Sequence, residues 1–267
     1  MQLRVLSWNL FHGRDFPPDP ALRTWRSRIL RIDERNATHL QVNRDLLPEF
    51  ARVLAGADWD LALLQECPPR WTKALGAACG GAALVSLTSR NSLGGLRALL
   101  ARQNPDLIAS NEGGANMILD RAGGFEEGLT VVLRAGPRPE RRTMGLARLG
   151  SGICVANLHA STADHLATED LSRAAERAVA WAAGAPVILG GDFNVRPDHS
   201  NVFRRLTEAY GFSAAAGAQA IDHVLVRGLE VVEPPRAWPP AAREVTEDGL
   251  AIRLSDHSPV AAVFAQG

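Results

Sequence analysis

Short apolar runs recur along the whole chain, and glycine, proline, asparagine or aspartate residues separate them. Runs of five to seven apolar residues between such turn formers are typical of strands that are buried inside a protein. The pattern predicts strands at residues 3–8, 61–64, 82–87, 116–119, 129–133, 152–158, 186–189, 221–226 and 259–264.

Helical patterns lie between some of these runs. Residues 44–55, 168–183 and 200–210 have helical spacing or a helix-favouring composition, and a glycine follows each stretch directly. Strands and helices therefore alternate, which predicts a mixed α/β fold with helices covering the sheets. No repeat or composition break divides the chain, so we expect one domain over residues 1–267.

Glycine, proline and asparagine also mark loops. The segment 89–114 is rich in glycine and asparagine, and within it residues 96–102 could form a short helix. We expect the remainder of that segment to offer substrate contacts. The strongest loop signals are at residues 14–20, 94–114 and 233–240.

Composition narrows the class of protein. The 267 residues are 46% hydrophobic and 22% charged, with a formal net charge of zero, so the global basic excess of many nucleic-acid binders is missing. Cys67, Cys79 and Cys154 form no CxxC pair, which argues against a disulfide framework or a thiolate zinc site. No signal peptide or membrane-spanning run is visible, so we expect a cytoplasmic protein, and no protein partner can be inferred.

Polar side chains that could bind a cation or a phosphate flank six of the predicted strands. Alone, each motif has an ordinary interpretation as a turn, a cap or a solvated strand end. Together they repeat one feature at the boundary of one buried strand after another. They are Asn9, Gln65-Glu66, Asn157-Leu158-His159, Asp192-Phe193-Asn194, Asp222-His223 and Asp256-His257.

The side chains in this set suit one chemistry. Carboxylates and carboxamides are hard oxygen ligands, which favour Mg²⁺ or Mn²⁺. Histidines titrate near neutral pH and could serve phosphate oxygens or protons. Phosphoester hydrolysis, which is very slow without a catalyst, requires such a combination. Among the other histidines, His223 is interpreted as a packed side chain, and His12, His39, His165 and His199 as loop or surface residues.

The ordered set of motifs resembles the endonuclease/exonuclease/phosphatase superfamily, which has the DNase I-like fold. The resemblance covers nearly the whole chain and implies a four-layer α/β/β/α sandwich with one active site at the sheet ends. The matching motifs are Ser7-Trp8-Asn9, Gln65-Glu66, Gly114-Ala115-Asn116, Asn157-Leu158-His159, Gly191-Asp192-Phe193-Asn194, Ile221-Asp222-His223 and Ser255-Asp256-His257-Ser258-Pro259.

The resemblance also implies a role for each matching residue. Glu66 would bind the divalent metal with Asn9 beside it, and Asp256 would lie near this metal or a second one. Asp192 and Asn194 would orient the attacking water. His257, paired with Asp222, would contact the scissile phosphate, and His159 would contact phosphate or donate a proton. We add Asn116 and Asn157 as candidate phosphate-binding residues.

The substrate is expected to be a phosphoester, with nucleic acid as the first class to consider. Phe11, Cys67 and His159 depart from the pattern of the abasic-site repair branch, which argues against a dedicated repair nuclease. Zero net charge mildly favours the alternative, a phosphoesterase for lipid headgroups, sugars or other small molecules. A non-catalytic binding module on the same fold is a third hypothesis.

Overall fold

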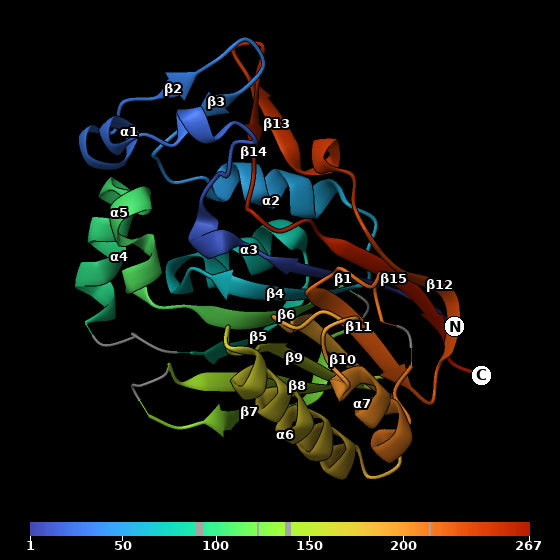
Figure 1. Cartoon of the computed structure of the whole chain (residues 1–267). Coiled ribbons are helices and arrows are strands. Elements are labelled where there is room, and N and C mark those ends of the chain that lie inside the picture. The colour runs from blue at the N-terminus through green and yellow to red at the C-terminus, as the bar shows by residue number, and fades with distance from the viewer. Residues whose placement is uncertain (89–92, 122, 137–139, 214) are drawn as a thin grey trace.

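Two β-sheets form the centre of the molecule (Figure 1). The computed structural model describes residues 1–88, 93–121, 123–136, 140–213 and 215–267. One sheet has the strand order β12 (Glu230–Ala237), β15 (Val260–Ala265), β1 (Gln2–Asn9), β4 (Leu61–Cys67), β6 (Ala115–Asp120) and β5 (Ala82–Leu87). The other has the order β11 (Asp222–Arg227), β10 (Val187–Asp192), β9 (Cys154–His159), β8 (Arg142–Leu149) and β7 (Phe125–Arg134).

Helices cover the outer faces of both sheets. One hydrophobic cluster joins the first sheet to α2 (Leu47–Gly56) and α3 (Thr72–Cys79). A second joins the other sheet to α6 (Asp164–Ala182) and α7 (Val202–Tyr210), and a third fills the space between the sheets. The predicted four-layer α/β/β/α sandwich is therefore confirmed.

A smaller group of elements lies beside this sandwich. Figure 1 shows α1 (Trp25–Leu30), α4 (Gly94–Gln103) and α5 (Pro105–Glu112) at one end of the molecule. Two short hairpins, β2 (Glu34–Arg35) with β3 (Leu40–Gln41) and β13 (Glu244–Glu247) with β14 (Leu250–Arg253), complete this end. Short 3₁₀ helices are η1 (Phe11–Gly13), η2 (Pro20–Leu22), η3 (Pro69–Trp71) and η4 (Pro240–Arg243).

Strand alternation decides which side chains face the space between the sheets. In β1, Leu6 and Trp8 pack towards the helices, whereas Leu3 and Val5 pack towards the other sheet. Side chains two residues apart share a face, so Asn9 continues the inward series. The strand pattern therefore directs the Asn9 side chain into the space between the sheets, at the edge of the hydrophobic cluster there.

Two glycines allow close packing at this end, Gly190 between the two sheets and Gly191 between the neighbouring strands β10 and β9. A Cβ atom on Gly190 would lie 2.5 Å from Leu63 Cδ1. At Gly191, φ is +141° and a Cβ atom would lie 1.9 Å from the Leu158 carbonyl oxygen. No other residue type fits at Gly191, because both the backbone conformation and the space exclude a side chain.

The short helix predicted at residues 96–102 is confirmed, since α4 spans it, but the loop predicted for the rest of 94–114 is wrong where α5 lies. Asn104 ends one helix and caps the next, where its Oδ1 accepts from the Leu107 backbone N–H at 3.1 Å. Pro105 takes the first position of α5, where its missing N–H costs nothing. Residues 89–92 of the longer segment lie outside the described residues.

The predicted loop at residues 233–240 is also partly wrong, because β12 runs through Ala237. Its two prolines are tolerated because β12 is an edge strand with register shifts. The sequence pattern also missed α3 and β8, and in β8 Thr143, Gly145 and Arg148 interrupt the apolar run. Over the described residues, no helix is long and apolar enough to cross a membrane.

Candidate active site

The polar ends of the strands meet at one edge of the sandwich. Asp192 is the centre of this group: its Oδ2 accepts from Asn9 Nδ2 at 2.9 Å, although the two residues belong to different sheets. Its Oδ1 accepts from the backbone N–H of Asn194 at 3.0 Å. Burial raises the pKa of Asp192, and the nearby imidazole of His159 opposes this rise. The site thus holds a desolvated carboxyl group in a fixed orientation.

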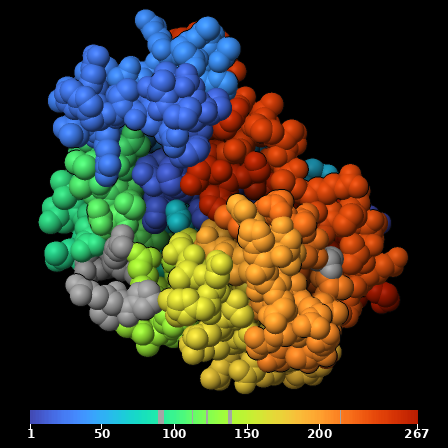
Figure 2. All heavy atoms as spheres, in the orientation of Figure 1, coloured from blue at the N-terminus to red at the C-terminus, as the bar shows by residue number. Residues whose placement is uncertain are grey.

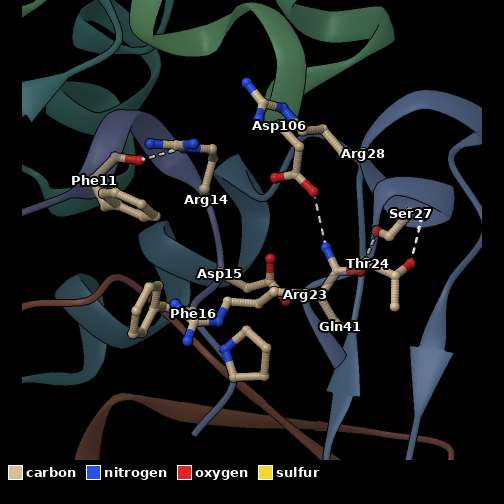
Figure 3. A pocket seen from close by; sticks show the side chains of 11 residues that line it. Phe11, Arg14, Asp15, Phe16, Arg23, Thr24, Ser27, Arg28, Gln41 and Asp106 are labelled. Atoms are coloured by element: carbon tan, nitrogen blue, oxygen red, sulfur yellow. Dashed lines mark hydrogen bonds between the residues drawn. The ribbon is translucent and has the colours of Figure 1, made fainter. Parts of the chain in front are cut away.

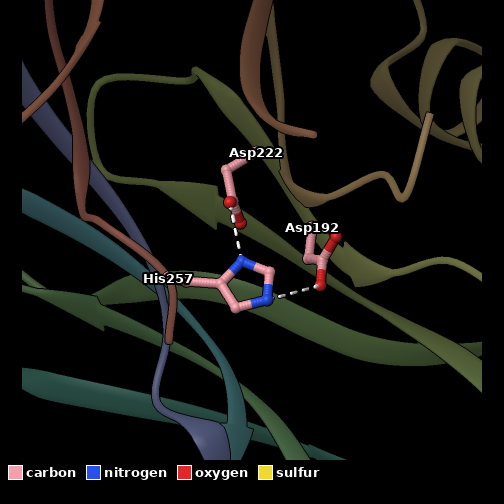
Figure 4. Close-up of side chains that lie close together, drawn as sticks. All are labelled: Asp192, Asp222 and His257. Atoms are coloured by element: carbon pink, nitrogen blue, oxygen red, sulfur yellow. Dashed lines mark hydrogen bonds and ion pairs between the residues drawn. The ribbon is translucent and has the colours of Figure 1, made fainter. Parts of the chain in front are cut away.

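His257 and Asp222 form the closest acid–imidazole pair (Figure 4). Their Nδ1 and Oδ2 atoms are 2.7 Å apart, and His257 Nε2 lies 3.8 Å from Asp192 Oδ2. Burial alone would lower the pKa of His257. The hydrogen bond to Asp222, with the surrounding carboxylate charges, outweighs this and raises the pKa to about 10. His257 is therefore an imidazolium at neutral pH, and its Nε2–H faces the centre of the site.

The loop before β15 is fixed by hydrogen bonds to β1. Ser255 has a positive φ of 60°, and its Oγ donates to the Asn9 carbonyl oxygen at 2.6 Å. The same Oγ accepts from the His257 backbone N–H at 3.0 Å, and the indole of Trp8 donates to the His257 carbonyl oxygen at 3.0 Å. These hydrogen bonds hold the backbone of His257 in place, and they do not involve Asp222.

Glu66 reaches the site through a break in strand regularity. A register shift between Leu64 and Cys67 adds a residue to β4, and Glu66 has a positive φ of 47°. Simple alternation would direct this side chain to the helix side of the sheet, so the bulge reorients it. Burial, with the charges of Asp192 and Asp256, raises the pKa of Glu66 to about 7.

Two histidines flank the Glu66 carboxylate. His12 Nε2 lies 3.2 Å from Oε2, and His159 Nδ1 lies 3.6 Å from Oε1. His12, interpreted from the sequence as a loop or surface residue, lies in the short helix η1 and contacts the site through Glu66. A signal was available, since His12 follows Asn9 by three residues in a tight turn. Burial lowers the pKa of His159 to about 3, so this imidazole is neutral.

The structure does not bring two predicted phosphate-binding residues into this cluster. Asn157 lies between the sheets, where its Nδ2 donates to the carbonyl oxygens of Leu64 at 3.0 Å and Met117 at 2.9 Å. Its Oδ1 accepts from Gln65 Nε2 at 2.8 Å. Asn116 is equally buried and donates to the Thr143 carbonyl oxygen at 2.7 Å. Both amides join one sheet to the other.

The oxygen donors fit a divalent cation. Glu66, Asn9 and Asp256 provide carboxylate and carboxamide oxygens at one edge, and the carboxylates influence the pKa of Glu66. A hard cation such as Mg²⁺ or Mn²⁺ suits this donor set. The ligand atoms of Asp192, Asp222 and His257 also lie within 4.8 Å of one another. We interpret that trio as a hydrogen-bonded ion pair instead, because a protonated imidazole offers no lone pair to a metal.

The sequence match agrees with this geometry. A sequence model of the endonuclease/exonuclease/phosphatase family matches residues 6–257, so the chain belongs to this family. Members of the family are phosphoester hydrolases. A search of curated proteins finds no match.

Solved structures confirm the fold. An endonuclease/exonuclease/phosphatase family protein from Bacteroides thetaiotaomicron has a TM-score of 0.66 and 17% identity, covering 100% of this chain and 98% of that one. A mannosyl-6-phosphatase from the same organism has a TM-score of 0.64 and 17% identity, covering 98% and 99%. A family protein from Beutenbergia cavernae has a TM-score of 0.64 and 17% identity, covering 100% and 72%. At these identities the likeness concerns the fold alone.

Proposed function

We propose that the chain hydrolyses phosphoesters with the help of a divalent cation, Mg²⁺ or Mn²⁺. The observation that carries the proposal is that three groups meet at one edge of the sandwich. They are the His257–Asp222 ion pair, the buried Asp192 carboxyl group, and Glu66 between two histidines. His257 lies 2.7 Å from Asp222, and Asn9 connects to Asp192 across the sheets at 2.9 Å. A packed structural core does not require charged groups of both signs in such a place.

Each residue would contribute a distinct effect. Glu66, Asn9 and Asp256 would hold the cation, which when bound supplies positive charge to the phosphate and the leaving oxygen. Asp192 and Asn194 would orient a water molecule for in-line attack, and Asp192 would accept its proton. The Nε2–H of His257 would donate to a phosphate oxygen, and His159, being neutral, would donate a hydrogen bond rather than a full proton.

Nucleic acid as the substrate stays a prediction. The zero net charge offers no global attraction for a polyanion. The test uses purified protein, Mg²⁺ or Mn²⁺, and two substrates: supercoiled plasmid and bis-p-nitrophenyl phosphate. Glu66→Ala is prepared in parallel, with Glu126→Ala, an exposed glutamate on β7, as the matched control.

We expect metal-dependent hydrolysis by the wild type and by Glu126→Ala, and a loss of roughly a hundredfold or more in Glu66→Ala. Plasmid nicking with this profile would support the nuclease prediction. Cleavage of the small ester alone would favour a small-molecule substrate. Equal activity in wild type and Glu66→Ala would refute the metal-binding role of Glu66, and inactivity of the wild type on every phosphoester tested would refute the hydrolase proposal.

A further inference from the structure

A cavity of about 310 Å³ lies beside the active site and is not part of the cluster described above (Figure 3). The segment after β1, helix α1, strand β3 and the start of α5 form its walls. Figure 2 shows the blue N-terminal segment in contact with the green segment of α4 and α5 on this side of the molecule. The cavity is large enough for a small organic molecule.

Short connections join this cavity to the active site. Phe11 lines the cavity, and its backbone N–H donates to Asn9 Oδ1 at 2.9 Å. Arg14 also lines it, three residues further on. Burial lowers the pKa of Arg14, and the charges of Asp106 and Glu66 oppose this lowering. A molecule with one end at Glu66 could therefore place its other end in the cavity.

Three arginines give the cavity its charge. Arg14, Arg23 and Arg28 line it, and none of them has a carboxylate within ion-pair distance in the part of the chain that the structure describes. Arg14 lies over the Phe11 ring at 3.8 Å and donates to the Phe11 carbonyl oxygen at 3.3 Å. Its remaining N–H groups stay available to a ligand.

The two acidic residues of the cavity offset only part of this charge, because three arginines share its lining with two carboxyl groups. Asp15 is buried, and this burial raises its pKa well above the usual range, which favours the uncharged carboxyl group. Its Oδ2 accepts from the Val42 backbone N–H at 3.1 Å, and its Oδ1 has no hydrogen-bond partner among the described residues. Asp106 accepts from Gln41 Nε2 at 2.9 Å. Burial raises the pKa of Asp106 and the charges of Arg14 and Arg28 lower it, so its carboxylate offsets part of the arginine charge.

We propose that this arginine pocket, lined by Arg14, Arg23 and Arg28, binds a second anionic group on the alcohol part of a small phosphoester substrate. The inference rests on the proposed function, because it assumes that the first phosphate is bound at the active-site cluster. A guanidinium group matches a phosphate or a carboxylate through paired N–H donors, and a partly desolvated guanidinium gains most from such a partner. The walled cavity and the zero net charge favour a small molecule over a nucleic-acid strand.

Calorimetric binding to the full chain carrying Glu66→Gln, which should not turn substrate over, tests the proposal. Matched probes differ by one anionic group: fructose 6-phosphate against fructose 1,6-bisphosphate, and glycerol 2-phosphate against 2-phosphoglycerate. A thymidine dinucleotide with and without a 5′-phosphate provides the nucleic-acid comparison. Arg14→Gln and Arg23→Gln remove the pocket charges, and Arg177→Gln, an exposed arginine on α6, is the control.

We expect the doubly anionic member of at least one small-molecule pair to bind about tenfold tighter. Arg14→Gln should remove this preference, Arg23→Gln should reduce it, and Arg177→Gln should leave it intact. The pair that shows the preference identifies phosphate or carboxylate as the second group. Equal affinities in every pair, no binding of any probe, or a preference that survives both pocket variants would overturn the proposal. A preference confined to the dinucleotides would overturn the small-molecule assignment.

Hydrolysis by the wild type separates the two proposals. If the bisphosphate binds tighter through Arg14 but no phosphoester is hydrolysed, the pocket stands and the proposed function falls. If the wild type hydrolyses both members of a pair with equal kcat/KM and the affinities are also equal, the function stands and the pocket proposal falls.

Discussion

Replacing Asp222 with asparagine tests the electrostatic core of the site. The carboxylate of Asp222 lies 2.7 Å from His257 Nδ1, and it is the main group that raises the pKa of His257 to about 10. Asparagine keeps the size of the side chain and can keep a hydrogen bond, but it removes the charge. Burial lowers the pKa of His257, and in this variant only the remaining carboxylates would oppose that lowering. The pKa of His257 should therefore fall towards or below its ordinary value of 6.5.

The size of the effect follows from the wild-type pKa. A rise from 6.5 to about 10 corresponds to roughly 5 kcal/mol of favourable interaction with the imidazolium. Because the folded-state pKa is raised, this stabilisation is fully present below pH 6.5. It is lost as the pH rises through about 10, at about 1.4 kcal/mol per pH unit. The free energy of unfolding should show this slope in the wild type and not in Asp222→Asn.

Two measurements check the prediction. NMR titration of the His257 ring carbons gives its pKa directly, and urea unfolding at several values of pH gives the slope. Asp248→Asn, at an exposed turn position, is the matched control and should leave both results unchanged. A His257 that titrates near 6.5 in the wild type, or a pKa that Asp222→Asn does not lower, would show that the ion pair does not hold the proton.

Two further predictions concern the scaffold. Gly191→Ala should destabilise the protein by about 2–4 kcal/mol, because its Cβ atom would lie 1.9 Å from the Leu158 carbonyl oxygen. Gly150→Ala is the control and should change stability little, because the space around Gly150 is open. Equal unfolding midpoints for the two variants would contradict the steric argument. Asn157→Ala should lower the free energy of unfolding by roughly 3 kcal/mol, because it leaves two carbonyl oxygens without a hydrogen-bond donor. Unchanged stability together with a raised KM would instead indicate that Asn157 binds the phosphate.

Much of the site could be predicted because strand alternation and motif order carry the same information. Asn9 and Asp192 end their strands and Asp222 begins one, and each lies where the inward series of apolar residues stops. The parity of each strand would have predicted which polar residues face the other sheet. It would also have shown Asn157 in line with Val155, deep between the sheets, and therefore suited to joining them.

Other features depend on three-dimensional details that no local pattern contains. Alternation alone sends Glu66 to the wrong face, and only the bulge between Leu64 and Cys67 returns it to the site. The arginine pocket joins α1 and α5, which lie far apart along the chain, and the sequence pattern predicted neither helix. The sequence around Arg14 and Arg28 does not distinguish them from the other arginines of this arginine-rich chain.

Backbone strain and buried charge coincide in this molecule. Five of the nine non-glycine residues with positive φ in the described part of the chain are Phe11, His12, Glu66, Asn194 and Ser255, all in the site or in the turns that form it. Such conformations cost of order 1 kcal/mol or more each, and the glutamate adds a desolvated carboxyl group. The surrounding apolar core must offset these costs. A fold selected for stability alone would relax them, so their concentration at one edge supports a function that requires Glu66 and its neighbours in these orientations.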